Sequence, residues 1–150
     1  EATSLFTIPE CLVERAWGDD VAHRLGARSS VNIVWARGME ARRAAINASL
    51  VANGISIDQS VEIDSALATL DLVSRSDWKT VTPALMIDPD ADRGRFTIAP
   101  LNDPEVIFSV MLLTLPSMKL SPEASAFVEI FCSVANDALA RWDGIFREFV

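Results

Sequence analysis

The sequence predicts an α/β fold in which strands alternate with helices. Runs rich in β-branched residues recur along the chain, and two of them are followed by stretches with helical spacing. Of its 150 residues, 50% are hydrophobic and 23% are charged, a composition that can bury a core and argues against disorder. Such alternation is what parallel βαβ units require.

The first thirty residues carry weak signals, which predict short strands at 5–8 and 11–13 and a turn of helix over 19–25. From residue 30 the signals sharpen. Residues 31–35 form a β-rich run that ends at Arg37-Gly38 and predicts a buried strand. Residues 40–53 predict a helix that closes at Asn53-Gly54, a pair that favours a left-handed C-cap.

The same pattern then repeats. Residues 60–63 alternate as a strand, and 65–74 have helical spacing after Asp64 and Ser65, which are both good N-caps. The second helix should therefore begin at the mouth of the sheet. In open α/β sheets, ligands bind at this mouth, where the parallel strands end.

Three more strands are predicted at 80–86, 96–101 and 106–115, and a solvated, turn-rich connection at 88–94. The last of these strands is the longest uncharged apolar run and is expected to be buried. Ser121-Pro122 reads as an N-cap followed by proline at the first helical position, so a long helix should run to about Phe146. Its apolar stripe comprises Ala124, Phe127, Val128, Phe131, Val134, Ala135, Ala138 and Trp142.

Composition narrows the function. The formal net charge of −8 argues against nucleic-acid binding by this chain, and its uncharged apolar runs fall short of the roughly 20 residues that span a bilayer. The cysteines, Cys11 and Cys132, lie far apart and are expected to be free thiols. His23 is the only histidine and lies near no nucleophile motif, so we expect no catalytic residue, metal or cofactor. The alternating aspartates at 88, 90 and 92 lack the glycine and glutamate spacing of a calcium loop.

The candidate site residues lie where strands pass into helices. In the segment Trp35, Ala36, Arg37, Gly38 and Met39, backbone N–H groups at the helix start can face an anion, and Arg37 can add a charge. Alternatively, Arg37 is a solvated loop charge and Gly38 only permits the turn.

Several other polar and aromatic residues have two readings. Asp64 and Ser65 can contact a ligand, although helix capping alone explains them. Trp78 can wall a pocket or pack in the crossover, and Thr80 can offer a hydroxyl or serve as an ordinary strand residue. The arginines at 42 and 43, with Glu40, read as an exposed helix face rather than a nucleic-acid patch.

Several segments together resemble one family. They are Glu62-Ile63-Asp64-Ser65, Asp77-Trp78, Thr80-Val81-Thr82-Pro83, Pro100-Leu101-Asn102-Asp103-Pro104 and Leu120-Ser121-Pro122-Glu123-Ala124. In order and spacing, over residues 30–131, they look like the effector-binding domain of LysR-type transcriptional regulators. The first segment is most similar to the nitrogen assimilation control-like branch.

This resemblance implies a type 2 periplasmic-binding-protein-like fold: here a partial two-lobed sheet with flanking helices and a long C-terminal helix. Residues 1–86 would form a crossover and lobe two, and 87–150 the closing half of lobe one. The implied protein is a cytoplasmic, homo-oligomeric sensor that binds a small, anionic effector between its lobes. It would contact DNA only through a winged helix-turn-helix absent from this chain, and would not contact a membrane.

The implied effector contacts are Trp35, Arg37, Gly38, Met39, Asp64, Ser65, Trp78 and Thr80. Two other functions stay open: a solute-binding protein of the same fold, and an interaction fragment that only oligomerises. Because part of lobe one is missing by this alignment, we expect the isolated chain to associate.

Overall fold

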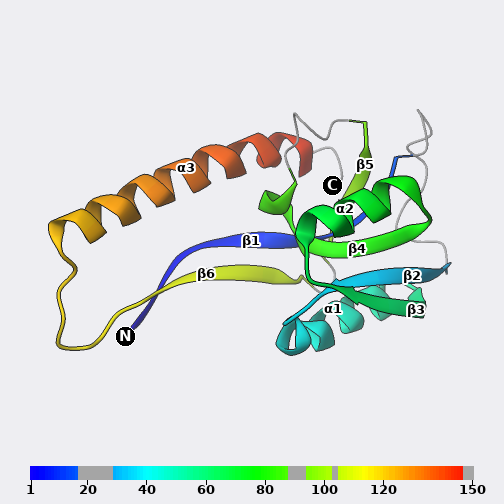
Figure 1. Ribbon diagram of the computed structural model, residues 1–150, viewed down its shortest axis with the longest axis horizontal. Helices are drawn as coiled ribbons and strands as arrows, with labels where there is room; N and C mark the ends of the chain where they lie inside the picture. Colours follow the sequence, from blue (N-terminus) through cyan, green and yellow to red (C-terminus); the bar gives the residue numbers. More distant parts are fainter. Residues whose placement is uncertain (17–28, 88–93, 103–104, 147–150) are drawn as a thin grey trace. The chain divides into compact units, whose positions relative to one another are not determined.

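The computed structural model describes residues 1–16, 29–87, 94–102 and 105–146, and it confirms the α/β class (Figure 1). The chain divides into two compact units. One unit is Pro9–Val106, and the other combines Glu1–Ile8 with Ile107–Val150. Strand β1 (Ala2–Arg15) contributes to both units.

The unit Pro9–Val106 is built on a sheet with the strand order β3-β2-β4-β1-β5. Its other strands are β2 (Ser29–Ala36), β3 (Ile55–Ile63), β4 (Trp78–Pro83) and β5 (Phe96–Pro100). Strand β2 pairs in parallel with both β3 and β4, which confirms the predicted βαβ order. Strand β1 runs antiparallel to β4 and β5.

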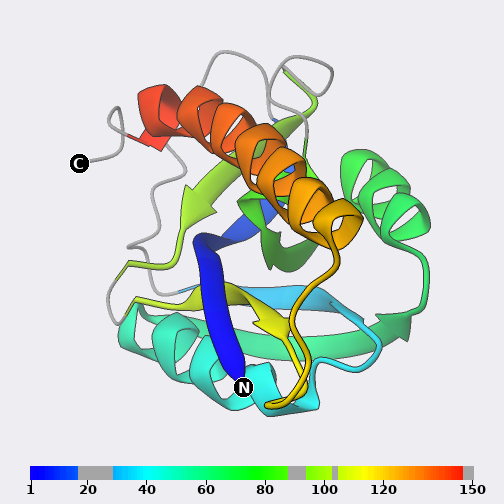
Figure 2. The same cartoon turned by 90° about the vertical axis from the view of Figure 1, so that its left-hand side faces the viewer.

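Helices α1 (Glu40–Ala52) and α2 (Ala66–Arg75) follow β2 and β3, and they lie on different sides of these strands (Figures 1 and 2). Helix α1 ends as predicted, because Gly54 has φ +74° and follows a C-cap asparagine. Its buried Ile46 and Leu50 pack with alternate residues of β2 in the main core cluster. The remaining members of that cluster are Leu12, Val31, Ile33, Trp35, Met39, Ile55, Val81, Leu101 and Val106.

Several predicted strand limits were wrong. The two short strands predicted before residue 14 form one continuous strand, β1. Strand β3 starts at Ile55, directly after the turn at Gly54, instead of at residue 60. Strand β4 ends at Pro83, which has no N–H to donate, and the chain continues as the 3₁₀ helix η1 (Ala84–Met86).

In the other unit, β6 (Ile107–Leu113) pairs with β1, and the long helix α3 (Pro122–Phe146) follows. The N–H of Ala124 donates to Ser121 Oγ at 3.2 Å, so the predicted cap is confirmed. The expectation that β6 is buried was wrong, because every second residue of the strand from Ile107 onward is exposed. On α3, Trp142 is buried, whereas Phe127 is 68% exposed.

The division into units places β5 with the first sheet, since β5 pairs with β1 between Cys11 and Arg15. The expected lobe boundary near residue 86 therefore falls inside the unit Pro9–Val106. The predicted helical turn at 19–25, with His23, lies outside the described residues, as does most of the acidic loop at 88–94.

Candidate functional site

The carboxyl ends of the parallel strands β2, β3 and β4 lie at one edge of the sheet, at Ala36, Ile63 and Pro83. Helices α1 and α2 both begin at this edge. We call it the carboxyl-end edge; it comprises residues 36–39, 64–65 and 83. Unpaired N–H groups at helix starts favour anions, so this edge has the potential expected of an anion-binding surface.

Arg37 and Asp64 meet at the carboxyl-end edge. Arg37 Nη1 lies 3.7 Å from Asp64 Oδ2, and the two side chains are 67% and 72% exposed. A pair so long and so exposed adds little stability, so a ligand can displace it at little cost. The structure thus brings together two of the residues that the sequence singled out.

The neighbouring Gly38 and Met39 have structural tasks. Gly38 has φ +79°, and an added Cβ would meet nothing within 4 Å, so backbone conformation rather than space favours glycine there. Met39 is 5% exposed and belongs to the core cluster, while its carbonyl accepts the N–H groups of Arg42 and Arg43. Only the backbone of Met39 is therefore positioned near a ligand at this edge.

Ser65 caps α2 as the sequence predicted. Its Oγ accepts the N–H of Ala68 at 3.3 Å, and its carbonyl accepts the N–H of Thr69 at 2.9 Å. The residue is exposed and has an extended backbone, with φ −112° and ψ 119°. Capping and ligand contact are compatible at Ser65, since one Oγ has two lone pairs.

Trp35 lies inside the core rather than on the carboxyl-end edge. It is 3% exposed, and the guanidinium of Arg43 lies 5.2 Å from the centre of its ring. Arg43 is held there by Glu62, whose Oε1 is 2.6 Å from Arg43 Nη2. Trp35 therefore supports the edge from beneath and is covered by an ion pair.

Trp78 and Thr80 are not brought to this edge. Trp78 opens β4 opposite Asn32 near the start of β2, at the far end of the parallel strands from Pro83. Thr80 is 2% exposed, and its hydroxyl donates to the carbonyl oxygen of Val34 at 2.8 Å. Effector contact by these two residues stays a prediction.

Sequence reasoning missed Glu10. This carboxylate is fully buried, 2.5 Å from Arg42 Nη2, and Glu10 pairs with Pro83 in the ladder between β1 and β4. Burial raises the pKa of Glu10, and the charge and hydrogen bond of Arg42 oppose that rise. The expectation of a solvated arginine face on α1 was wrong, because Arg42 and Arg43 are ion-paired and only partly exposed. The available signal was an acid inside the apolar run from Ile8 to Val13.

The described residues include no group of three or more His, Cys, Asp or Glu side chains placed to hold a metal ion. Within the same ranges, no helix is both long and apolar enough to cross a membrane.

Comparison with known proteins identifies the family. The model of the LysR substrate binding domain matches residues 22–135, which is more than half of the chain. No curated protein sequence matches the chain.

Solved structures show the fold. The CcmR regulatory domain of Synechocystis PCC6803 in complex with 2-PG aligns with a TM-score of 0.60 and 14% identity, over 89% of this chain and 66% of that one. A putative transcriptional regulator from Vibrio parahaemolyticus aligns with a TM-score of 0.68 and 13% identity, over 94% and 67%. The effector binding domain of QuiR in complex with shikimate aligns with a TM-score of 0.54 and 20% identity, over 88% and 63%.

The chain thus spans about two thirds of the length of these relatives. The likeness confirms a periplasmic-binding-protein-like fold. The matching family consists of regulatory effector-binding domains of transcriptional regulators and is not an enzyme family. The chain belongs to the LysR substrate binding domain family.

Proposed function

We propose that this chain is the ligand-sensing part of a LysR-type transcriptional regulator and that it binds a small anionic effector at the carboxyl-end edge. One observation supports this most directly: the starts of two helices and an exposed arginine lie together at the ends of parallel strands. The first has a positive potential, and the second can bind a carboxylate or phosphate with two hydrogen bonds. The family match favours this regulator over the solute-binding alternative.

The contacts proposed for the effector follow from this geometry. Arg37 would pair with the anion, and the amide groups that follow Gly38 and Ser65 would donate to it. Asp64 would release Arg37 as the anion binds, because the exposed pair between them is weak. Related domains in complex with 2-PG and with shikimate make small anions the natural first probes.

The test is a titration of the ¹⁵N-labelled chain with shikimate and, separately, with inorganic phosphate, followed by amide chemical shifts. We expect the amide signals of Gly38 and Ser65 to move, and Arg37→Gln to weaken binding about tenfold or more, the loss of one charge-assisted hydrogen bond. Arg75→Gln is the matched control, because Arg75 is also exposed and paired with an aspartate, Asp71, but lies at the other end of α2. Equal weakening by both variants, or no shift at either amide, would refute the proposed site.

We further propose that effector binding controls DNA contact by a separate winged helix-turn-helix, in a cytoplasmic regulator of the nitrogen assimilation control-like branch. The branch assignment rests on the segment Glu62-Ile63-Asp64-Ser65. The unit Pro9–Val106 would be lobe two, because it holds both βαβ units, and the other unit would be the described part of lobe one.

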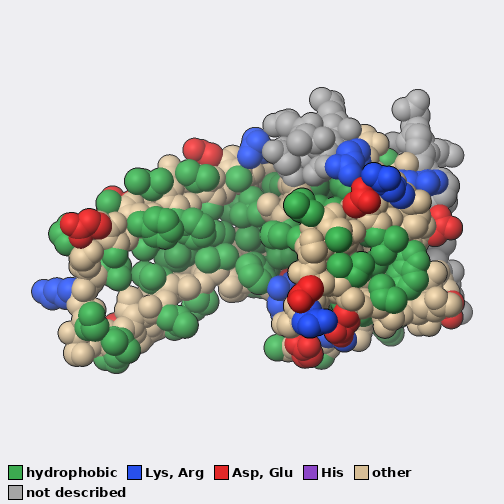
Figure 3. All heavy atoms as spheres, in the orientation of Figure 1, with side chains coloured by type: hydrophobic (Ala, Val, Ile, Leu, Met, Phe, Trp, Pro, Cys, Tyr) green, Lys and Arg blue, Asp and Glu red, His purple; other side chains and the backbone are tan. Residues whose placement is uncertain are grey.

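We also propose that two copies associate through the exposed side of α3. Phe127, Ile130, Phe131 and Val134 recur there at helical spacing, and the rings of Phe127 and Phe131 stack with centroids 6.1 Å apart. The first of these rings is 68% exposed and the second 39%. Figure 3 shows hydrophobic side chains gathered over α3 and β6. A surface of this kind marks an interaction site.

Light scattering at micromolar concentration tests this association. We expect a dimer for the wild-type chain, and a shift towards monomer for Phe127→Ser. Glu129→Ser, on the same helix, should leave the mass unchanged. A monomeric wild-type chain would refute self-association without affecting the effector site.

A further inference from the structure

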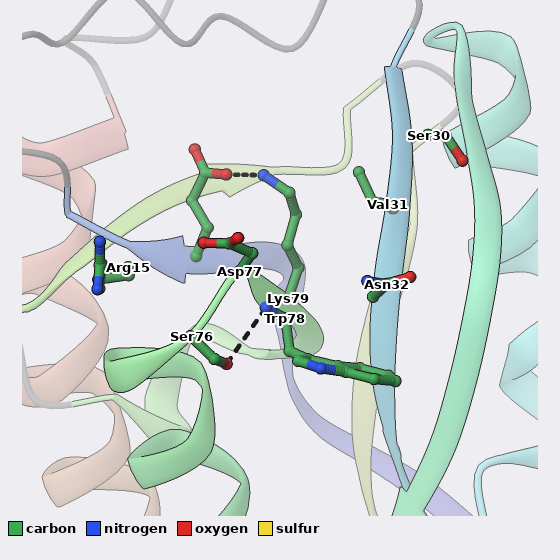
Figure 4. Close-up of a pocket in the computed structure, with 9 residues that line it drawn as sticks. Arg15, Ser30, Val31, Asn32, Ser76, Asp77, Trp78 and Lys79 are labelled. Atoms are coloured by element: carbon green, nitrogen blue, oxygen red, sulfur yellow. Dashed lines mark hydrogen bonds and ion pairs between the residues drawn. The ribbon is translucent and has the colours of Figure 1, made fainter.

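A pocket of about 260 Å³ opens at the amino ends of β2 and β4, the opposite end of these strands from the carboxyl-end edge (Figure 4). We call it the amino-end pocket. All of its lining belongs to the unit Pro9–Val106. The lining residues are Glu14, Arg15, Ser30, Val31, Asn32, Ser76, Asp77, Trp78 and Lys79.

The charged groups of the amino-end pocket balance. Glu14 and Asp77 are acidic, Arg15 and Lys79 are basic, and Glu14 pairs with Lys79 across the ladder between β1 and β4. Burial lowers the pKa of Lys79, so the pair lies in surroundings that water reaches poorly. A pocket with equal numbers of both charges does not favour a simple anion, in contrast to the carboxyl-end edge.

Two further groups call for a hydrogen-bond donor. Asn32 Oδ1 is buried and has no hydrogen-bond partner among the described residues, which is costly unless a donor reaches it. In Figure 4 the indole ring of Trp78 extends towards β2 below Asn32, with Asp77 and Lys79 on the opposite side. An aromatic face attracts an ammonium group, and an amide oxygen accepts its N–H.

We propose that the amino-end pocket binds a small zwitterion, an α-amino acid whose ammonium contacts Asn32 Oδ1 and the Trp78 ring and whose carboxylate faces Arg15. The guanidinium of Arg15 has five N–H donors, so it can serve a ligand in addition to its contacts within the protein. The pocket is slightly smaller than the sites that hold drug-sized molecules, which suits a ligand of amino-acid size. This is a second site, and it does not depend on the anion site proposed above.

Calorimetry with the full chain tests this. L-serine and L-leucine are titrated separately, beside propanoate and ethylamine, which each carry one of the two charges. We expect heat of binding with at least one amino acid and none with either half-ligand at the same concentration. Asn32→Val keeps a strand-forming residue and removes the acceptor, so it should weaken binding about tenfold or more. Asp64→Asn at the carboxyl-end edge is the control and should leave this affinity unchanged.

A second measurement keeps the test independent of the folding of the variant. In the wild-type chain the indole N–H signal of Trp78, assigned with Trp78→Phe, should shift on titration with the amino acid that binds. Three results would overturn the proposal: no binding of either amino acid, binding as tight with ethylamine alone, or binding that Asp64→Asn abolishes and Asn32→Val does not. An unmoved indole signal would do the same.

Discussion

The buried ion pair between Glu10 and Arg42 permits a quantitative prediction. Arg42→Leu retains helix propensity and most of the apolar stem, but it leaves the fully buried carboxylate of Glu10 without its cation. Breaking one side of a buried pair costs about 3–5 kcal/mol, a large part of the roughly 5–15 kcal/mol by which domains are stable. We therefore expect a large drop in the free energy of unfolding at pH 7.

The pH dependence gives this prediction its sign. The pKa of Glu10 is raised in the folded protein above its ordinary 4.5, chiefly by burial, so the folded state holds a proton on this group more readily than the unfolded state. The contribution of Glu10 to stability is then fully present below its unfolded pKa and falls as the pH rises through its folded pKa. Without Arg42 the folded pKa rises further, so the cost of Arg42→Leu should shrink between pH 7 and pH 5.

Urea unfolding followed by circular dichroism at both pH values measures this cost. Arg75→Leu is the control, because Arg75 is 77% exposed and its pair with Asp71 should be worth no more than about 0.5 kcal/mol. Adding Glu10→Gln to Arg42→Leu should recover much of the lost stability at pH 7, since it removes the stranded charge. Equal costs for the two arginine variants, or a cost of Arg42→Leu that does not change with pH, would refute this reasoning.

Other predictions follow from single contacts. Burial, with a smaller effect of the Glu10 charge, raises the pKa of the Cys11 thiol to about 12, so Cys132 should react first with Ellman's reagent, and Cys132→Ser should leave only a slowly reacting thiol. Ser65→Ala should lower the free energy of unfolding by about 1 kcal/mol through loss of the α2 cap, measured by urea unfolding. Thr80→Val should cost about 0.5–1.5 kcal/mol in the same assay, because it removes the buried hydrogen bond to Val34.

The parts that the sequence predicted well depend on neighbours in the chain. The caps at Ser65 and Ser121 and the turn at Gly54 were predicted correctly, because a cap or a C-terminal turn is decided within about four residues. The same locality placed Arg37 and Asp64 after parallel strands, and so close together. Sheet order follows from alternation of strands and helices only when the strands are parallel.

The missed features depend on partners distant in sequence. Nothing near Glu10 shows that Arg42 neutralises it, and nothing near Trp35 shows that Arg43 covers it. The exposure of β6 was missed for a related reason: a continuous apolar run indicates a buried strand only if something covers both faces. The part of the chain that the structure describes leaves alternate residues of β6 uncovered.

The two proposed sites lie at opposite ends of the same strands, and their separation decides whether they interact. From Trp78 to Pro83, a rise of 3.3 Å per residue gives about 17 Å, beyond the roughly 8 Å over which physiological salt leaves charges unscreened. Sites farther apart than about 10 Å with no shared partner are usually independent. Between these sites the strands are fixed by ladder pairing and by the bond from Thr80 to Val34, a rigid region with no second arrangement. Asn32→Val should therefore leave the affinity for shikimate or phosphate unchanged; a clear change would mean that β2 and β4 transmit binding from one end of the sheet to the other.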